Sequence, residues 1–130
     1  MRLLTSYFDS PRASGGKRRD IVFVSVAGRS PDWIELKCRK LAPKRAWWNY
    51  WHSKFEGRLS SDESKAWYAA KYRETVLAAV TQREIVGELE AFGCSDVFLL
   101  CWEKPEEFCH RQLIAEWLNE AGFRCEEATA

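Results

Sequence analysis

The chain has 130 residues, of which 46% are hydrophobic and 30% charged, proportions typical of one globular domain of that size. No run approaches the roughly 18 apolar residues that a membrane span needs, and the first residues lack the apolar core of a secretion signal. We therefore expect one domain over residues 1–130, no membrane association and a cytoplasmic location.

The net charge of +1 hides a division along the chain. Residues 1–58 hold 13 Lys and Arg against 5 Asp and Glu, and residues 59–130 hold 7 against 14. Aromatic residues also gather in the basic half: Trp33, Trp47, Trp48, Tyr50 and Trp51. Cationic and planar side chains together bind phosphates and bases, so the expected partner is a phosphate-bearing small molecule or a nucleic acid. A solvated basic face over an aromatic core would give the same composition. The oligomeric state is not predicted.

The cysteines are odd in number and irregularly spaced: Cys38, Cys94, Cys101, Cys109 and Cys125. In a chain with no recognisable export signal, this pattern indicates reduced thiols in a reducing compartment.

The first half of the chain predicts two strands and a long irregular stretch. Residues 2–7 begin with apolar and β-prone side chains, and residues 21–28 form a nearly continuous β-branched run closed by glycine. Such a run is typical of a strand covered on both faces. Residues 8–20 predict a loop, and residues 29–44 an extended segment with one helical turn after Pro31.

The second half predicts helices separated by buried strands. Helical periodicity covers 45–57, 60–80 and 81–93, with Ser60 and Thr81 as caps followed by Glu63 and Glu84 three residues later. A strand over 96–103, a helix over 111–122 and a last strand over 123–127 follow. This order predicts an α/β fold, a single layered domain with a small, mostly parallel sheet flanked by helices.

The stretch LLCWEKPEEFCHRQLIAEWL, residues 99–118, joins the penultimate strand to the following helix. Open α/β sheets bind ligands at the carboxyl ends of their strands. Free N–H groups at the helix start, together with the forked cation of Arg111, favour a phosphate or a carboxylate there.

Reactive groups accompany this anion-binding corner. The helix dipole and nearby cations would favour the thiolate of Cys109, His110 could act as a general acid or base, and Glu103 could be its carboxylate partner. Ordinary packing is the alternative, because Cys109 shares a helical stripe with Leu113 and Trp117.

Metal binding by Cys101, Cys109 and His110, with Cys38 or His52 as a further ligand, is the runner-up chemistry. The seven residues between the two cysteines are not the spacing of a zinc knuckle, and adjacent side chains point about 100° apart on a helix. We therefore predict no cofactor and no metal.

The same stretch resembles the signature of a family of bacterial and phage proteins, domain of unknown function 488, in which Leu-Cys-x-Glu-Lys is followed by Cys-His-Arg. TSYF (5–8), VSVAGRSPDW (24–33), KLAP (40–43) and WYAAKYRETVL (67–77) are similar to its short subgroup. The resemblance implies an α/β fold and a site around Cys101, Glu103, Lys104, Cys109, His110 and Arg111, with Ser6, Tyr7, Ser25, Pro43 and Tyr72 as neighbours. It implies no reaction.

The leading hypothesis is an enzyme acting on a nucleotide, nucleoside or nucleic acid. The expected catalytic residues are Cys109, His110 and Glu103. The expected anion-binding residues are Arg111, Lys104, Ser6, Tyr7, Ser25, Lys44 and Tyr72, helped by basic residues of the 12–19 loop, Lys40 or Arg45. A non-catalytic module that binds nucleic acid or another anionic partner is the alternative, and a thiol redox or metal-binding protein is the third.

Overall fold

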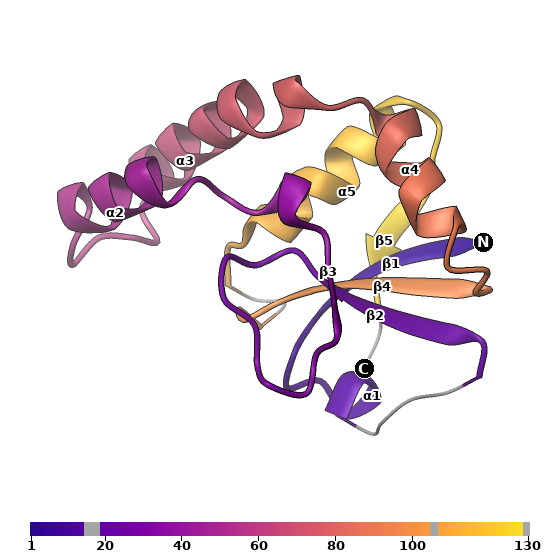
Figure 1. Cartoon of the computed structure of the whole chain (residues 1–130). Coiled ribbons are helices and arrows are strands. Elements are labelled where there is room, and N and C mark those ends of the chain that lie inside the picture. Colours follow the sequence, from indigo (N-terminus) through magenta and orange to yellow (C-terminus); the bar gives the residue numbers. More distant parts are fainter. Residues whose placement is uncertain (15–18, 105–106, 129–130) are drawn as a thin grey trace.

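The computed structural model describes residues 1–14, 19–104 and 107–128, and all statements below concern these segments. Five strands form one sheet: β1 (Arg2–Tyr7), β2 (Ile21–Ser25), β3 (Leu36–Lys37), β4 (Asp96–Cys101) and β5 (Cys125–Glu127). Their order is β3-β2-β4-β1-β5, and every neighbouring pair is parallel (Figure 1). The predicted α/β fold with a parallel sheet is confirmed.

Strand β4 lies at the centre because its side chains are apolar on both faces. Val97, Leu99 and Cys101 join the larger core cluster, whereas Phe98 and Leu100 join a smaller one on the opposite face. Alternate residues of a strand point to opposite faces, so a continuous apolar run requires cover on both.

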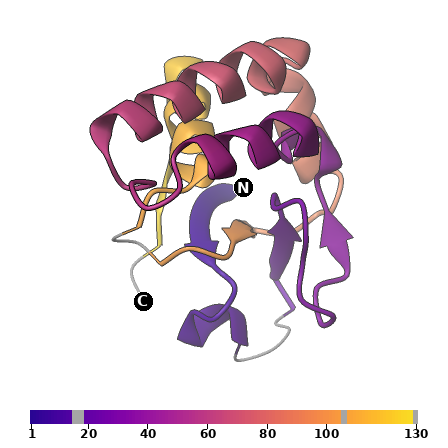
Figure 2. The ribbon, with the colours of Figure 1, turned by 90° about the vertical axis from the view of Figure 1, so that its left-hand side faces the viewer.

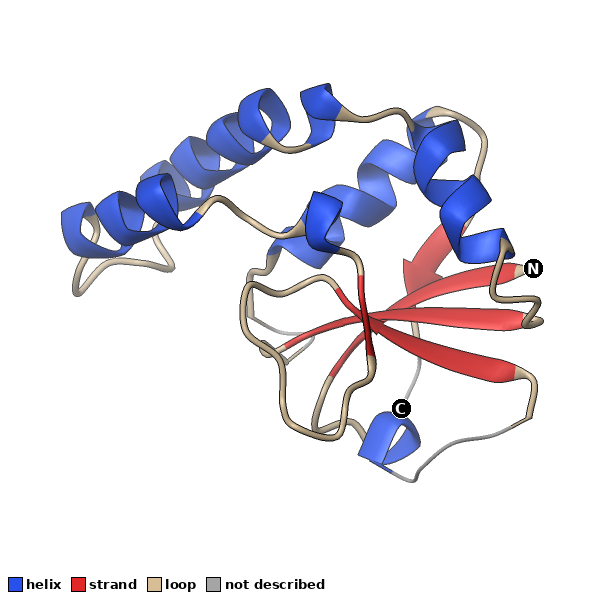
Figure 3. Ribbon diagram, viewed as in Figure 1, coloured by secondary structure: helices blue, strands red, loops and turns tan. Residues whose placement is uncertain are grey.

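The helices provide that cover unequally. Four of them supply the larger core, namely α2 (Arg45–Lys54), α3 (Asp62–Thr75), α4 (Gln82–Glu90) and α5 (His110–Glu120). The single turn α1 (Pro11–Ser14) lies on the other face (Figures 1 and 3). Helices α2 and α3 lie side by side and project past the edge at which the strands end (Figures 1 and 2). None of the described helices is both long and apolar enough to cross a bilayer.

Helix caps agree with the sequence only in part. The Thr81 hydroxyl accepts a hydrogen bond from the Glu84 N–H, as predicted. Helix α3 is instead capped by Ser61, which accepts from the Ser64 N–H, so Ser60 is not the cap. The predicted helix 60–80 also ends at Thr75, and a 3₁₀ turn, Leu77–Ala79, follows.

Three elements of the first half of the chain were not predicted. Strand β3 and a 3₁₀ turn, Arg39–Leu41, lie within the segment expected to be extended, and the residues after Pro31 form a turn closed by the Ile34 N–H on the Pro31 carbonyl. Helix α1 lies within the predicted loop 8–20, of which residues 15–18 fall outside the described segments. The strand expected over 21–28 ends at Ser25.

Candidate functional site

The candidate site lies where β4 ends and α5 begins. Cys101 is the last residue of β4, and Cys109 is the N-cap of α5, whose first residue is His110 rather than Arg111. The N-cap N–H of Cys109 donates to Gln112 Oε1 at 3.3 Å, which fixes the helix start. The two cysteines therefore lie at the carboxyl edge of the sheet, where open parallel sheets place ligand sites.

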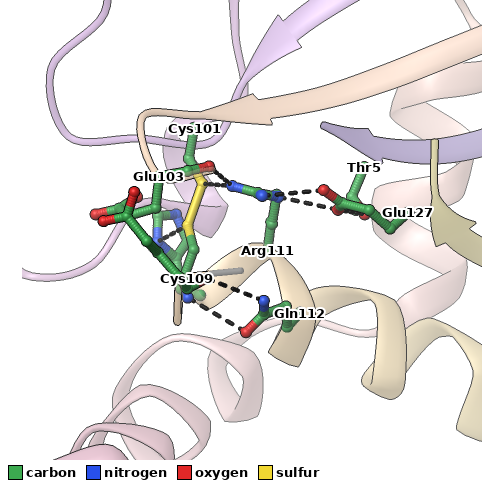
Figure 4. Close-up of polar contacts among 9 residues, drawn as sticks. Thr5, Cys101, Glu103, Cys109, Arg111, Gln112 and Glu127 are labelled. Atoms are coloured by element: carbon green, nitrogen blue, oxygen red, sulfur yellow. Dashed lines mark hydrogen bonds and ion pairs between the residues drawn. A yellow bond between two sulfur atoms is a disulfide. The ribbon is translucent and has the colours of Figure 1, made fainter. Parts of the chain in front are cut away.

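A disulfide joins Cys101 to Cys109, and both residues are buried (Figure 4). The prediction that all thiols are reduced is therefore wrong for this pair. The chain leaves β4 and returns to begin α5 directly above it, which brings together two sulfurs only eight residues apart in sequence. Cys101 and Cys109 were expected together only as ligands of a metal, and no bond between them was predicted.

The remaining cysteines, Cys38, Cys94 and Cys125, are free thiols. Burial raises the pKa of Cys38 and raises the pKa of Cys125 to about 12. Both thiols are therefore protonated at neutral pH and are poor nucleophiles.

Arg111 is fully buried and held on all sides (Figure 4). Its Nε and Nη2 donate to the two carboxylate oxygens of Glu127, each at 3.0 Å. Its Nη1 donates to Cys101 Sγ at 2.9 Å and to the main-chain oxygen of Glu103. The guanidinium predicted to grip a substrate anion is thus paired with a carboxylate of the protein, and one of its N–H groups donates to the Cys101 sulfur.

Glu127 and Thr5 complete this arrangement, and neither was predicted. The Thr5 hydroxyl donates to Glu127 Oε1 at 2.7 Å, from a residue 122 positions away. Strands β1 and β5 are neighbours, with Thr5 opposite Glu127 in register. The sequence does show that Glu127 ends a predicted strand. That position indicates a role in the site only once the first and last strands are known to pair.

His110 is buried, and its two ring nitrogens have different roles. Nε2 lies 2.6 Å from the Val26 carbonyl oxygen, which can only accept, so Nε2 carries the proton. Burial, opposed by this hydrogen bond and aided by the charge of Arg111, lowers the pKa of His110 to about 4. The ring is therefore neutral at physiological pH, and the Nδ1 lone pair faces Cys109 Sγ at 3.7 Å.

Glu103 and Lys104 follow β4 directly. Burial raises the pKa of the Glu103 carboxyl, although the charge of Arg111 opposes the shift. In Figure 4, Glu103 lies next to the sulfur pair. The Lys104 side chain is exposed.

The two predicted serines lie on the far face of the sheet from Arg111. Ser6 alternates with Thr5 along β1, and its neighbours Leu4 and Phe8 belong to the smaller core cluster. Ser25 is buried on the same side, where its hydroxyl oxygen accepts from the Ala27 N–H and the Ser30 hydroxyl. Strand alternation thus separates both serines from the disulfide.

The other predicted anion-binding residues lie around the disulfide without joining it. Tyr7 pairs in register with Cys101 and is partly exposed. The Tyr72 ring packs 5.4 Å from that of His110, its hydroxyl donates to the Leu41 carbonyl, and burial raises its pKa well above the usual value. Lys44 is exposed just before α2.

Lys40, also considered for phosphate binding, is engaged elsewhere. Its Nζ lies 2.9 Å from Glu84 and 2.6 Å from Glu88, both on α4. Arg45 is exposed at the start of α2.

One group of side chains could hold a metal. The ligating atoms Cys101 Sγ, Cys109 Sγ and His110 Nδ1 all lie within 4.8 Å of one another. Cys38 and His52, considered as further ligands, do not belong to this group. His52 is exposed and stacks on Trp48 at 5.0 Å between ring centroids.

Fold and site together define an α/β protein with a buried cysteine pair and a buried arginine at the carboxyl edge of a parallel sheet. A family model described as the active DUF488-N3 subclade, DUF488-N3a, matches residues 6–122. The chain therefore belongs to the DUF488 family, as the Cys-His-Arg signature predicts. No curated protein and no solved structure matches it.

Proposed function

We propose that this protein is a thiol-dependent enzyme whose reactive sulfur is that of Cys101. The observation that carries the proposal is the 2.9 Å contact of Arg111 Nη1 with a sulfur that is also bonded to Cys109. A guanidinium at this distance favours the thiolate once the disulfide is reduced, and the thiolate is the nucleophilic form of cysteine. Cys109, the nucleophile predicted from the sequence, becomes the partner thiol.

The proposed reaction starts from the reduced pair. The Cys101 thiolate attacks an electrophilic atom of the substrate, and the leaving group departs with the bonding electrons. Glu103 supplies the proton to the leaving group, and burial, which raises the pKa of its carboxyl, favours the protonated form. Water then attacks the same substrate atom, the Cys101 thiolate leaves with the bonding electrons, and a proton of the water returns to Glu103. The Cys109 thiol donates a hydrogen bond to the unprotonated Nδ1 of His110, which holds it beside Cys101.

The disulfide is the oxidised resting form in this proposal. A hydroperoxide takes two electrons and two protons from the dithiol, which yields the disulfide, water and an alcohol or a second water. A small thiol in excess restores the pair. We place the protein in the cytoplasm, where disulfides are usually transient and either catalytic or redox-sensing.

The proposed substrate is a nucleotide, nucleoside or nucleic acid. Support comes from the charge of the segment that runs from β3 through α2. Residues 36–55 contain six Lys and Arg and no Asp or Glu. Since Arg111 is occupied within the protein, exposed cations such as Lys44, Arg45 and Lys104 are the better candidates for binding phosphate.

Peroxide oxidation of the reduced protein tests which sulfur reacts. In a Cys109→Ser variant, Cys101 has no partner thiol, so we expect its sulfenic acid to persist and to be trapped when the oxidised protein is unfolded in urea that contains dimedone, with the adduct located by mass spectrometry. Hydrogen peroxide suits this test because both sulfurs are buried. Cys94→Ser, at a partly exposed free thiol, is the control and should still form the disulfide. Trapping at Cys109 in Cys101→Ser, with none at Cys101 in Cys109→Ser, would overturn the assignment.

Substrate class is tested separately by thermal shift of the reduced protein with a panel of nucleotides and short oligonucleotides. A ligand present at about 100 times its Kd stabilises the folded state by about 2.7 kcal/mol, which gives a clear rise in Tm. The shift should fall in a Lys44→Ala, Arg45→Ala double variant. No shift with any member would remove the nucleotide part of the proposal and leave the thiol chemistry intact.

A second candidate function is binding of single-stranded nucleic acid without catalysis. The favouring observation is the α2 surface, which we define as Lys44, Arg45, Trp48 and His52, all exposed. Trp48 and His52 stack with their planes 21° apart, and an aromatic face beside cations binds bases and phosphates. Lys44 and Arg45 stand at the N-terminus of α2, where the helix dipole disfavours cations.

Fluorescence anisotropy with a labelled single-stranded oligonucleotide tests this function. Binding should weaken as salt rises, with a slope set by the phosphates neutralised. Trp48→Ala should weaken it by roughly 1–3 kcal/mol, the usual contribution of one stacked base. Arg124→Ala, which removes a cation that is 85% exposed near the start of β5, should leave binding unchanged. Salt-independent binding, or equal loss in both variants, would contradict this candidate.

A further inference from the structure

Cys101, Cys109 and His110 hold three soft or borderline ligand atoms close together. Cys101 Sγ, Cys109 Sγ and His110 Nδ1 lie within 4.8 Å of one another, and all three residues are buried. They come from the end of a central strand and the start of the helix above it, so their positions are fixed by the core. Two thiolates and an imidazole are the donor set that favours zinc.

The orientation of His110 matches that of a metal ligand. Its Nε2–H donates to the Val26 carbonyl at 2.6 Å, which leaves the Nδ1 lone pair facing the Cys109 sulfur at 3.7 Å. Metal-binding histidines almost always donate their second nitrogen to a carbonyl or carboxylate in this way. The His110 tautomer needed for coordination is therefore already selected by the fold.

The spacing also suits an ion once the sulfurs are reduced. Bonds of about 2.3 Å to sulfur and about 2.0 Å to nitrogen at a tetrahedral angle place the two ligand atoms roughly 3.5 Å apart. Cys109 Sγ and His110 Nδ1 are 3.7 Å apart. The Cα atoms of the two cysteines lie 7.5 Å apart. A disulfide usually spans only about 4.4–6.8 Å, so the backbone leaves room for an ion between two sulfurs.

The charged groups around the three ligand atoms would balance the charge of such an ion. Two thiolates offset a divalent cation, and the bidentate Glu127 carboxylate offsets Arg111, whose Nη1 would remain as a hydrogen-bond donor to the Cys101 sulfur. Burial of all three ligands removes competing water from the protein side of the ion. Three protein ligands leave a fourth position open, as in catalytic zinc sites.

We propose that the reduced protein binds one Zn²⁺ through Cys101 Sγ, Cys109 Sγ and His110 Nδ1, and that the zinc form and the disulfide form exclude each other. The inference rests on the proposed function only in requiring that the Cys101–Cys109 bond be reducible. Zinc binding occupies the Cys101 thiolate and keeps it from a substrate until peroxide oxidises the pair. Hydrogen peroxide oxidises the two thiolates to the disulfide, takes up two protons to form two waters, and releases Zn²⁺.

Titration of the anaerobically reduced full-length protein with Co²⁺, followed by displacement with Zn²⁺, tests the site. We expect thiolate-to-cobalt charge-transfer absorption and the visible bands of tetrahedral Co²⁺, saturating at one ion per chain. Cys101→Ser and Cys109→Ser should each weaken binding by more than about 100-fold, because loss of even an outer-shell partner costs roughly 10- to 100-fold. Cys94→Ser should bind as the unaltered protein does. Peroxide should then release one Zn²⁺ per disulfide formed, measured with a chromogenic chelator.

Thiol counting separates this inference from the proposed function. Reduction should raise the titratable thiols of the denatured protein from three to five. If five thiols titrate and the circular dichroism of the fold is kept, absence of the cobalt bands overturns the zinc site, as does their persistence in Cys101→Ser. Trapping of the Cys101 sulfenic acid is independent of either result, so the thiol chemistry can survive loss of the zinc site, and the zinc site can survive loss of the thiol chemistry.

Discussion

Two regions of this molecule were both predicted to bind anions, and their cations are in opposite physical situations. In the thiol corner, which comprises Cys101, Cys109, His110, Arg111 and Glu127, the cation is fully buried and its donors are shared between a carboxylate, a sulfur and a carbonyl. On the α2 surface, Lys44 and Arg45 are exposed, and no ion pair holds either of them within the described segments. Arg111 therefore fixes the positions of neighbouring groups of the protein, whereas Lys44 and Arg45 face solvent.

The difference shows how to distinguish a charged side chain that positions groups of the protein from one that can bind a ligand. A buried guanidinium must be satisfied within the protein, because an unpaired buried charge is strongly unfavourable. Arg111 can then act only on the groups that it contacts, such as the Cys101 sulfur. An exposed cation on a helix N-terminus gains nothing from the fold and can form a phosphate contact without breaking an existing one.

Breaking the Arg111–Glu127 pair should have the largest effect on stability. We expect Glu127→Ala to lower the free energy of unfolding by about 3–5 kcal/mol, because Arg111 is left buried without its counter-ion. Arg111→Met should cost less, since the side chain of Glu127 is 31% exposed and can be solvated. Urea denaturation of both variants shows which one loses more free energy of unfolding.

Glu126→Ala is the matched control on the same strand. Its partner Arg124 is 85% exposed, so the loss should stay below about 1 kcal/mol. Equal losses for Glu126→Ala and Glu127→Ala would show that the thiol corner is not held by its buried pair.

Most of the fold could be predicted because its signals are local. Strands β1, β2 and β4 are apolar runs, and Thr81 caps α4 through a contact three residues away. Strand β3 has only two residues, too few to show any periodicity. Helix α3 ends near Val76, which no breaker residue marks, so its end depends on packing rather than on propensity.

Only the part of the site that is continuous in sequence could be predicted. The Cys-His-Arg segment lies in the predicted corner, whereas Thr5 and Glu127 meet it only because the first and last strands pair. The disulfide depends on the distance between the start of α5 and the end of β4. The number of residues between the two cysteines does not determine that distance.

The pH dependence of stability should report the burial of His110. The pKa of His110 is about 4 in the folded protein, against 6.5 for the ordinary side chain. Below pH 6.5 the unfolded chain takes up a proton that the folded protein does not, so stability falls as pH decreases. At 1.36 kcal/mol per unit for the fully titrating range, and half of that at pH 6.5 itself, lowering the pH from 6.5 to 5 should cost about 1.6 kcal/mol.

Urea denaturation at several pH values measures this dependence against two variants. His110→Gln should flatten the profile over that range. His52→Gln, at the exposed second histidine of the chain, should keep it. A wild-type profile that is flat from pH 6.5 to 5 would mean that His110 is not held neutral by burial.

The α2 surface should show the smallest effect on folding and a separate effect on binding. Arg45→Ala removes a cation from the N-terminal end of α2, so we expect the free energy of unfolding to stay within about 0.5 kcal/mol or to rise slightly. In oligonucleotide binding, the same change should reduce the slope of log K against log salt by about 1, since one phosphate contact is lost. A large loss of stability would show instead that Arg45 serves the fold. The contrast with Glu127→Ala is then direct, because the Glu127 charge would matter to folding and the Arg45 charge to oligonucleotide binding without affecting folding.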